Sequence, residues 1–206
     1  MSVARSAETA VVFAGLPDRF ESEGFDREHM RMPEGHLRMI EAVARANPRT
    51  VVVLLCGSAV ECPWADQVQA ILYMGLPGEA GGEAVANLLY GRVNPYGRLA
   101  ESWPLRYEDV PSSAIYGKTR DALKAPHSCD YAAHHALARE AAEQGAVLLK
   151  NDGGLLPLEE KARIAVIGVM AKAMRFQGAG SSHINPMHLS QPLDFLPGAA
   201  YAPGCD

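Results

Sequence analysis

Short, unbroken apolar runs alternate along the chain with stretches of mixed polarity. The runs are rich in valine and isoleucine, and they cover residues 9–15, 50–57, 69–75, 145–151 and 163–169. Runs of this length without polar interruption are typical of strands that are covered on both faces, as in a parallel sheet. The pattern therefore predicts a sheet that is buried between two layers.

Three intervening stretches place their apolar residues at helical spacing. The stretch 33–48 begins with a proline and ends at an Asn-Pro pair, both of which are typical helix boundaries. The stretch 79–91 ends at a glycine. The stretch 131–145 follows Asp130, which we expect to be its N-cap. The alternation of strands and helices predicts an α/β fold, a doubly wound and mostly parallel sheet with helices on both faces.

One segment departs from this alternation. Residues 107–130 are polar, contain two prolines and show little periodicity, which indicates a linker. We therefore interpret residues 1–206 as a single domain in which 1–106 and 131–206 share one sheet across that linker. A chain of 206 residues with 48% hydrophobic residues is long enough for one sizeable core.

Charge and composition exclude several partners. The formal net charge is -5 and no block of lysine and arginine occurs, which argues against nucleic-acid binding. No apolar stretch approaches the roughly 20 residues of a membrane helix, and the first residues lack the apolar segment of a signal peptide. We expect a cytoplasmic protein that acts on a small molecule.

The cysteines indicate no metal clip or disulfide framework. None of the four forms a CxxC pair, and they are Cys56, Cys62, Cys129 and Cys205. We expect reduced thiols. Cys56 and Cys62 lie in or just after a predicted buried strand, where a thiol is usually structural.

The richest cluster of chemical groups follows the first predicted strand. The stretch "GLPDRFESEGFDREHMRMP", residues 15–33, holds five carboxylates together with arginines and a histidine. In doubly wound sheets, ligands bind beyond the carboxyl ends of the strands. This segment, called the opening loop below, is therefore the first candidate for a site.

Several motifs resemble one known domain. They are "FESEGFDR…MPEGHLRMIEAVARANPRTVVVLLCGSAVECPW", "GLPGEAGGEAVANLLYGRVNPYGRLAESWPL" and "HHALAREAAEQGAVLLKNDGGLLPL…IAVIGVMAKAMRFQGAGSSHINP". Together they resemble the α/β sandwich domain of glycoside hydrolase family 3, the β-glucosidase family. In that family the "LLKN" part precedes the "ESEGFDR" part, so the resemblance implies a circular permutation, which is tolerated when the original ends lie close together.

The resemblance implies roles for residues of the opening loop. Retaining glycoside hydrolysis uses two carboxyl groups about 5 to 5.5 Å apart. The match gives the acid/base role to Glu23, with Glu21 as the second choice. We expect Asp26, Arg27 and His183 to bind the substrate. The family's nucleophile lies in a (β/α)8 barrel of about 250 residues, which this sequence does not contain, so we expect no retaining glycosidase activity from the chain alone.

Two histidine groups suggest a second chemistry. Neutral imidazole and carboxylate are ligands for zinc and manganese. The candidate metal ligands are Asp26, His29 and His36 in one group and Asp130 and His134, near His127 and Cys129, in the other. The alternatives are surface histidines in the first group and a helix of the family in the second. The turn "GAGSSHINP" lacks nucleotide-binding spacing, so no nucleotide cofactor is expected.

Three functional classes remain open at this point. The chain is part of a glycosidase that needs a separate barrel, or a sugar-binding or structural module, or a metal-dependent hydrolase. In the third class, a divalent metal would activate water for attack on a phosphoester, as in a phosphodiesterase. Loss of the barrel would also expose an apolar face, from which we expect a homodimer.

Overall fold

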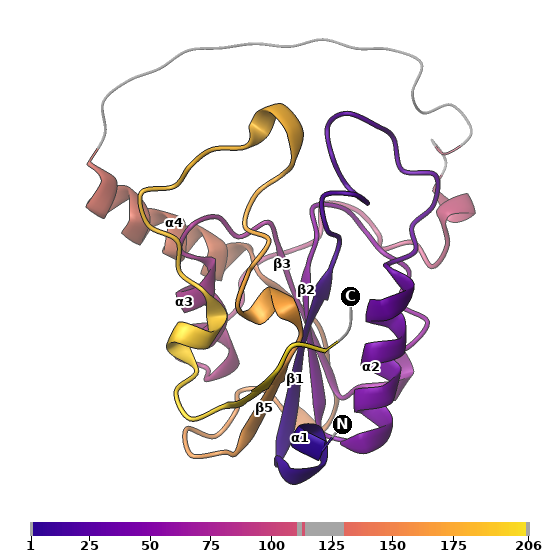
Figure 1. The fold of residues 1–206 in the computed structure, drawn as a ribbon, viewed down its shortest axis with the longest axis vertical. Coiled ribbons are helices and arrows are strands. Elements are labelled where there is room, and N and C mark those ends of the chain that lie inside the picture. The colour runs from indigo at the N-terminus through magenta and orange to yellow at the C-terminus, as the bar shows by residue number, and fades with distance from the viewer. Residues whose placement is uncertain (1, 111–112, 114–129, 205–206) are drawn as a thin grey trace.

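The computed structural model describes residues 2–110, 113 and 130–204. These residues form a six-stranded sheet in the order β4-β3-β2-β1-β5-β6 (Figure 1). All neighbouring strands are parallel except β3 and β4, which are antiparallel. The strands are β1 (Thr9–Gly15), β2 (Thr50–Leu55), β3 (Ala70–Gly75), β4 (Val147–Asn151), β5 (Ile164–Ile167) and β6 (Ala200–Ala202).

Helices lie on both faces of this sheet, as the sequence predicts. They are α1 (Ser2–Ser6), α2 (Glu34–Ala46), α3 (Gly81–Leu89) and α4 (Tyr131–Gly145). In Figure 1, α2 covers one face, and α3 and α4 lie on the other. The predicted doubly wound, mostly parallel α/β fold is therefore confirmed.

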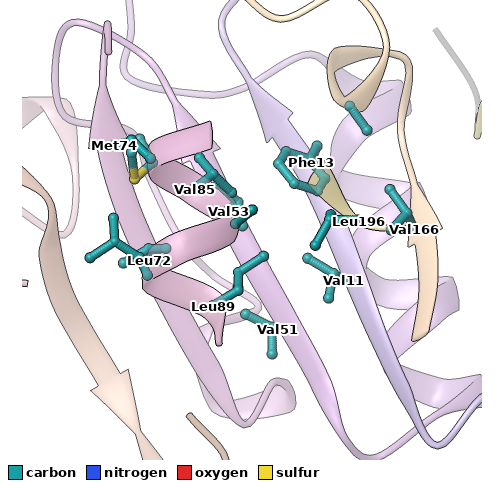
Figure 2. Packing of buried hydrophobic residues seen from close by; sticks show 14 of the residues in the cluster. Val11, Phe13, Val51, Val53, Leu72, Met74, Val85, Leu89, Val166 and Leu196 are labelled. Carbon is teal, nitrogen blue, oxygen red and sulfur yellow. The ribbon is translucent and has the colours of Figure 1, made fainter. Parts of the chain in front are cut away.

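Alternation along the central strands explains the two cores. Val11 and Phe13 of β1 point toward α3, where they pack with Val53 and Leu89 (Figure 2). Val12, between them in sequence, belongs to the cluster on the α2 side. Because successive strand residues face opposite sides, a strand covered on both sides needs an unbroken apolar run.

The edges of the sheet differ from the sequence prediction. The run 145–151 is predicted as a covered strand, but β4 is an edge strand with partly exposed side chains, and Leu148 is 38% exposed. An apolar run alone does not distinguish a central strand from an edge strand. The other edge strand, β6, is only three residues long, and its sequence, Ala-Tyr-Ala, lacks the valine and isoleucine that mark the predicted strands.

Two loops rise from the same end of the sheet. The opening loop leaves the carboxyl end of β1, and the segment 168–190 leaves the carboxyl end of the adjacent parallel strand β5 (Figure 1). At the start of that segment, Gly168 has a φ of 116°, and a Cβ there would lie 2.2 Å from the Phe13 carbonyl oxygen. Because glycine has no Cβ, the backbone at the end of β5 can lie this close to the backbone of β1.

The two ends of the described chain lie close together. Val3 of α1 and Gly204, after β6, line the same groove of about 460 Å³ on the α2 side of the sheet. Among the residues that the structure describes, none of the helices reaches the length and apolar content of a membrane span.

Candidate acid/base site

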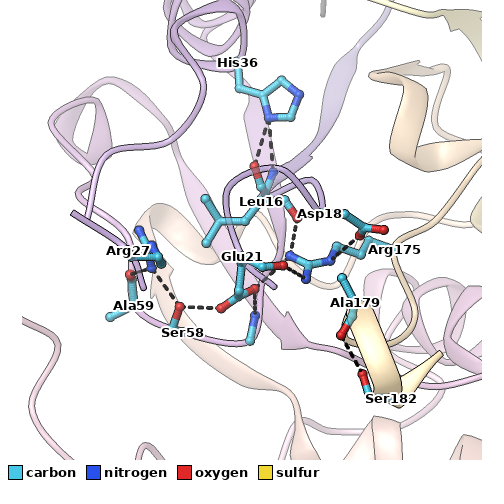
Figure 3. Close-up of polar contacts among 12 residues, drawn as sticks. Leu16, Asp18, Glu21, Arg27, His36, Ser58, Ala59, Arg175, Ala179 and Ser182 are labelled. Atoms are coloured by element: carbon cyan, nitrogen blue, oxygen red, sulfur yellow. Dashed lines mark hydrogen bonds and ion pairs between the residues drawn. The ribbon is translucent and has the colours of Figure 1, made fainter. Parts of the chain in front are cut away.

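Glu21 of the opening loop is bound by three donors from two other segments. Its carboxylate accepts a hydrogen bond from the backbone N–H of Gly57 at 2.9 Å, another from the Ser58 hydroxyl, and one from Arg175 Nη1 at 2.8 Å (Figure 3). The side chain is 19% exposed. These contacts fix the loop to the residues that follow β2 and to the segment after β5.

Arg175 is the buried cation of this arrangement. Its side chain is 7% exposed, Nη2 donates to the Glu21 carbonyl oxygen at 2.8 Å, and Nη1 also donates to the Leu16 carbonyl oxygen. Its Nε lies 3.5 Å from an Asp18 carboxylate oxygen. Removing an ion from water is costly unless charge and hydrogen bonds compensate for it, and here the opening loop supplies both.

Glu23 is placed differently, on the exposed part of the same loop. Its Oε2 accepts hydrogen bonds from the backbone N–H of Ser181 at 2.9 Å and from the Ser181 hydroxyl. Ser181 lies in a short 3-10 turn, Gly180–Ser182, which begins at a glycine with a φ of 75°. The carboxylate of Glu23 is thus bonded to Ser181 of the segment 168–190, and the side chain is exposed.

The predicted substrate-binding residues lie on two sides of this arrangement. Arg27 Nη1 donates to the Ser58 hydroxyl at 2.7 Å and to the Ala59 carbonyl oxygen at 3.0 Å. Burial lowers the pKa of the Arg27 guanidinium, and nearby Glu21 opposes that effect. Asp26 is exposed beside it, and both line a cavity of about 830 Å³.

His183 lies apart from that cavity. Its Nε2 is 3.5 Å from an Asp18 carboxylate oxygen, and both side chains are 54% exposed. Since Asp18 also contacts Arg175, it links His183 to the ion pair between Arg175 and Glu21.

The first predicted metal group does not come together as three ligands. His36, on α2, is 5% exposed, and its Nδ1 lies 3.0 Å from the Gly15 carbonyl oxygen. His29 Nδ1 accepts a hydrogen bond from the Arg31 N–H at 3.2 Å, and His29 lines the cavity with Asp26. Within 2–110, 113 and 130–204, no three histidine, cysteine or acidic side chains are arranged to hold a metal ion.

The second predicted metal group lies at the start of α4. The Asp130 carboxylate accepts hydrogen bonds from Ala132 and Ala133 N–H groups, both at 3.1 Å, so its predicted role as an N-cap is confirmed. His134 is exposed, whereas His135 lies 3.3 Å from a Glu79 carboxylate oxygen. His127 and Cys129 lie outside the described residues.

The two described cysteines are free thiols, as the sequence predicts. Burial raises the pKa of the Cys56 thiol far above its ordinary value and raises that of Cys62 to about 12. Because the thiolate is the reactive form, both side chains are poor nucleophiles at neutral pH. Cys129 and Cys205 lie outside the described residues.

Arg175 and Ser181 were missed by sequence reasoning. Their contacts with the opening loop join residues that are 154 and 158 positions apart. The sequence offers one signal for Arg175, which is its position as a charged residue directly after the largely apolar stretch that follows β5. Ser181 had a weaker signal, its place in the Gly/Ser-rich turn that matches the sandwich domain.

Comparison with known proteins identifies the family of the chain. The sequence profile of the glycosyl hydrolase family 3 C-terminal domain matches residues 1–137 and 146–201. Thermostable β-glucosidase B of Acetivibrio thermocellus is 55% identical over 109 residues, which are 53% of this chain and 14% of that protein. An exo-α-(1→6)-L-arabinopyranosidase of Bifidobacterium longum is 43% identical over 113 residues, 54% of this chain and 15% of that protein.

Solved structures give the same result. A family 3 β-glucosidase of Bifidobacterium adolescentis has a TM-score of 0.53 at 41% identity, over 57% of this chain and 18% of that chain. The β-glucosidase of Kluyveromyces marxianus in complex with glucose has a TM-score of 0.50 at 36% identity, over 56% of this chain and 14% of that chain. The chain thus spans less than a fifth of the length of these relatives. It belongs to glycoside hydrolase family 3, as the C-terminal α/β sandwich domain of that family.

Proposed function

We propose that this domain supplies Glu23 as the general acid/base for hydrolysis of a β-glucoside. The observation that carries the proposal is the exposed carboxylate of Glu23 at the carboxyl edge of the sheet. Its Oε2 lies 2.9 Å from the backbone nitrogen of Ser181, which positions it. The relatives named β-glucosidases support the substrate class. The nucleophile would come from a barrel in another part of the protein or in another chain.

The contacts of Glu21 favour a positioning role for that residue. A general acid must reach the leaving oxygen and must gain and lose a proton in each cycle. The Glu21 carboxylate is instead engaged by Arg175, Gly57 and Ser58. Protonation would weaken its pair with a buried guanidinium, so Glu21 is suited to holding the loop and Glu23 to proton transfer.

The mechanism that follows has two steps. Glu23 protonates the glycosidic oxygen while the barrel carboxylate attacks the anomeric carbon, so that the aglycone leaves and a glycosyl-enzyme forms. Glu23, now a carboxylate, then removes a proton from the water that attacks the anomeric carbon, and the sugar is released. Ser181 would hold the carboxylate in place for the second step.

The other functional classes gain less support. A sugar-binding or structural module would bind saccharide without turnover, which a comparison of binding with hydrolysis would reveal. The metal-dependent phosphoester hydrolase lacks a specific supporting observation among the described residues, because they bring no three ligands together. The homodimer and the permuted order of the two halves remain predictions.

A chimera of this domain and a relative tests the proposal. In thermostable β-glucosidase B, the part corresponding to residues 9–110 would be exchanged for this chain's residues, and phenyl β-glucoside hydrolysis would be measured. We expect an active chimera, an activity loss of about 100-fold or more in Glu23→Gln, and no turnover by the 206-residue chain alone. An active chimera that is indifferent to Glu23→Gln would contradict the acid/base assignment.

A further inference from the structure

We propose that the cavity of about 830 Å³ beside the opening loop binds a phenolic ring, the aglycone of an aryl β-glucoside. The assignment of that ring to an aglycone rests on the proposed function, whereas ring binding does not. The volume lies within the range of small-molecule sites, about 300 to 1,000 Å³. The cavity is called the ring pocket below.

Part of the lining of the ring pocket is aromatic and aliphatic. Phe25 of the opening loop and Trp103, Leu105 and Val110 of the segment after α3 line it. Leu105 is 81% exposed and Phe25 is 49% exposed. Exposed apolar groups that converge on one cavity are typical of a ligand site. A planar apolar ring would cover both of them.

Trp103 is held in place before any ligand arrives. Its Nε1 donates a hydrogen bond to the Val60 carbonyl oxygen at 2.8 Å. Its ring meets the Tyr73 ring edge to face, with centroids 5.0 Å apart and planes at 79°. A side chain fixed by two contacts loses little conformational freedom on binding, which favours affinity.

Polar side chains also line the ring pocket. Asp26 has an exposed carboxylate that can accept a hydrogen bond from a sugar hydroxyl of the ligand. Arg27 is fixed by Ser58 and Ala59, and its buried Nη2 finds no hydrogen-bond acceptor among the described residues. A lining that combines apolar and polar side chains suits an aromatic ring joined to a sugar.

The charges of the ring pocket disfavour an anionic ligand. Asp26, Glu101 and Asp109 line it, whereas Arg27 is the arginine in its lining. Glu21 is paired with Arg175, and Asp109 lies 3.2 Å from Arg106. A phosphate ester would face more carboxylates than cations, so a neutral ring is the better match.

Tryptophan fluorescence can read this pocket directly. The chain has two tryptophans, and Trp64 is fully buried in the core, so Trp64→Phe leaves Trp103 as the reporter. We expect phenyl β-glucoside to change the Trp103 emission saturably, and methyl β-glucoside, which lacks the ring, to leave it unchanged. Calorimetric titration of the unsubstituted chain repeats the comparison if Trp64→Phe does not fold.

A matched pair of leucine variants locates the binding. Leu105→Ala removes an exposed side chain from the ring pocket, and Leu137→Ala removes a 62% exposed side chain from α4. We expect the affinity for phenyl β-glucoside to fall about threefold to tenfold in Leu105→Ala and to stay unchanged in Leu137→Ala. No saturable binding, or an equal loss in both variants, would overturn the proposal.

The two tests can fail independently of each other. Ring binding is measured on the 206-residue chain without turnover, while the acid/base role is measured by hydrolysis in the chimera. Saturable ring binding together with an active chimera that Glu23→Gln does not impair would support the ring pocket and contradict the proposed function. A loss of hydrolysis in Glu23→Gln without saturable ring binding would support the proposed function and contradict the ring pocket.

Discussion

Glu21 and Glu23 belong to the same loop, but their surroundings differ. Glu21 is bound to a buried arginine, a backbone N–H and a hydroxyl, whereas Glu23 is exposed and touches Ser181. The first arrangement fixes a carboxylate and the second leaves it accessible. A cluster of carboxylates in one loop can therefore contain an anchor and a reactive group, and the contacts distinguish them.

The largest expected effect is a loss of stability when Glu21, the anchor of the opening loop, loses its partner Arg175. Arg175→Ala would leave Glu21 with a partly buried charge and would leave backbone carbonyl groups without a donor. We expect the free energy of unfolding to fall by about 3 kcal/mol, measured by urea denaturation. The control is Arg38→Ala, which removes an exposed pair with Glu34. Equal effects of the two substitutions would show that the buried pair does not hold the loops.

A direct comparison of the two carboxylates gives the next effect. Glu21→Gln exchanges a charged acceptor for a neutral amide beside Arg175, and we expect it to cost about 2 kcal/mol of unfolding free energy. Glu23→Gln changes an exposed side chain, and its cost should stay below about 0.5 kcal/mol. Thermal and urea unfolding of both variants would check the order. The reverse order would contradict the assignment of Glu21 as the anchor.

Removal of the Ser181 hydroxyl should affect proton transfer more than stability. In the active chimera, extended to include residues 163–190 of this chain, Ser181→Ala leaves the Glu23 carboxylate with the backbone N–H alone. We expect kcat for phenyl β-glucoside to fall about tenfold, because one hydrogen bond that positions the carboxylate is lost. Ser182→Ala, which removes a hydroxyl bonded to the Ala179 carbonyl oxygen, is the matched control. If both variants behave alike, Ser181 does not position Glu23.

The smallest expected effect on stability comes from reversing the order of residues 1–113 and 130–206 along the chain. Val3 and Gly204 line one groove, so a short Gly/Ser linker can join them while the chain is opened between residues 113 and 130. We expect a folded protein whose unfolding free energy lies within about 1 kcal/mol of the original. Circular dichroism and urea denaturation would check this. A variant that fails to fold would argue against the inferred permutation.

Local patterns in the sequence predicted most of the fold. The runs at β1, β2, β3 and β5 are unbroken because both faces of these strands are covered, and that coverage is visible in the sequence itself. Edge position is set by neighbours elsewhere in the chain, so the partial exposure of β4 and the short β6 could not be predicted in this way.

The site was predicted less completely, for a related reason. The carboxylates of the opening loop and the N-cap at Asp130 are local features and were found. The partners that distinguish Glu21 from Glu23 include Arg175 and Ser181, which lie more than 150 positions away along the chain, in the segment after β5. The closeness of Asp26, His29 and His36 in sequence did not predict a three-ligand group among the described residues, where His36 Nδ1 lies near the Gly15 carbonyl oxygen on β1.

The leaving-group dependence of the chimera tests the central claim most directly. kcat/KM, which reports formation of the glycosyl-enzyme and excludes the later step in which Glu23 acts as a base, would be compared for phenyl and 2,4-dinitrophenyl β-glucosides in Glu23→Gln and Glu21→Gln. Dinitrophenolate departs without a proton, so an acid/base role predicts that Glu23→Gln loses activity mainly on the phenyl substrate, by about 100-fold or more. Glu21→Gln should lower both rates alike. If Glu23→Gln lowers both rates equally and Glu21→Gln spares the dinitrophenyl substrate, the roles of the two carboxylates are the reverse of those assigned here.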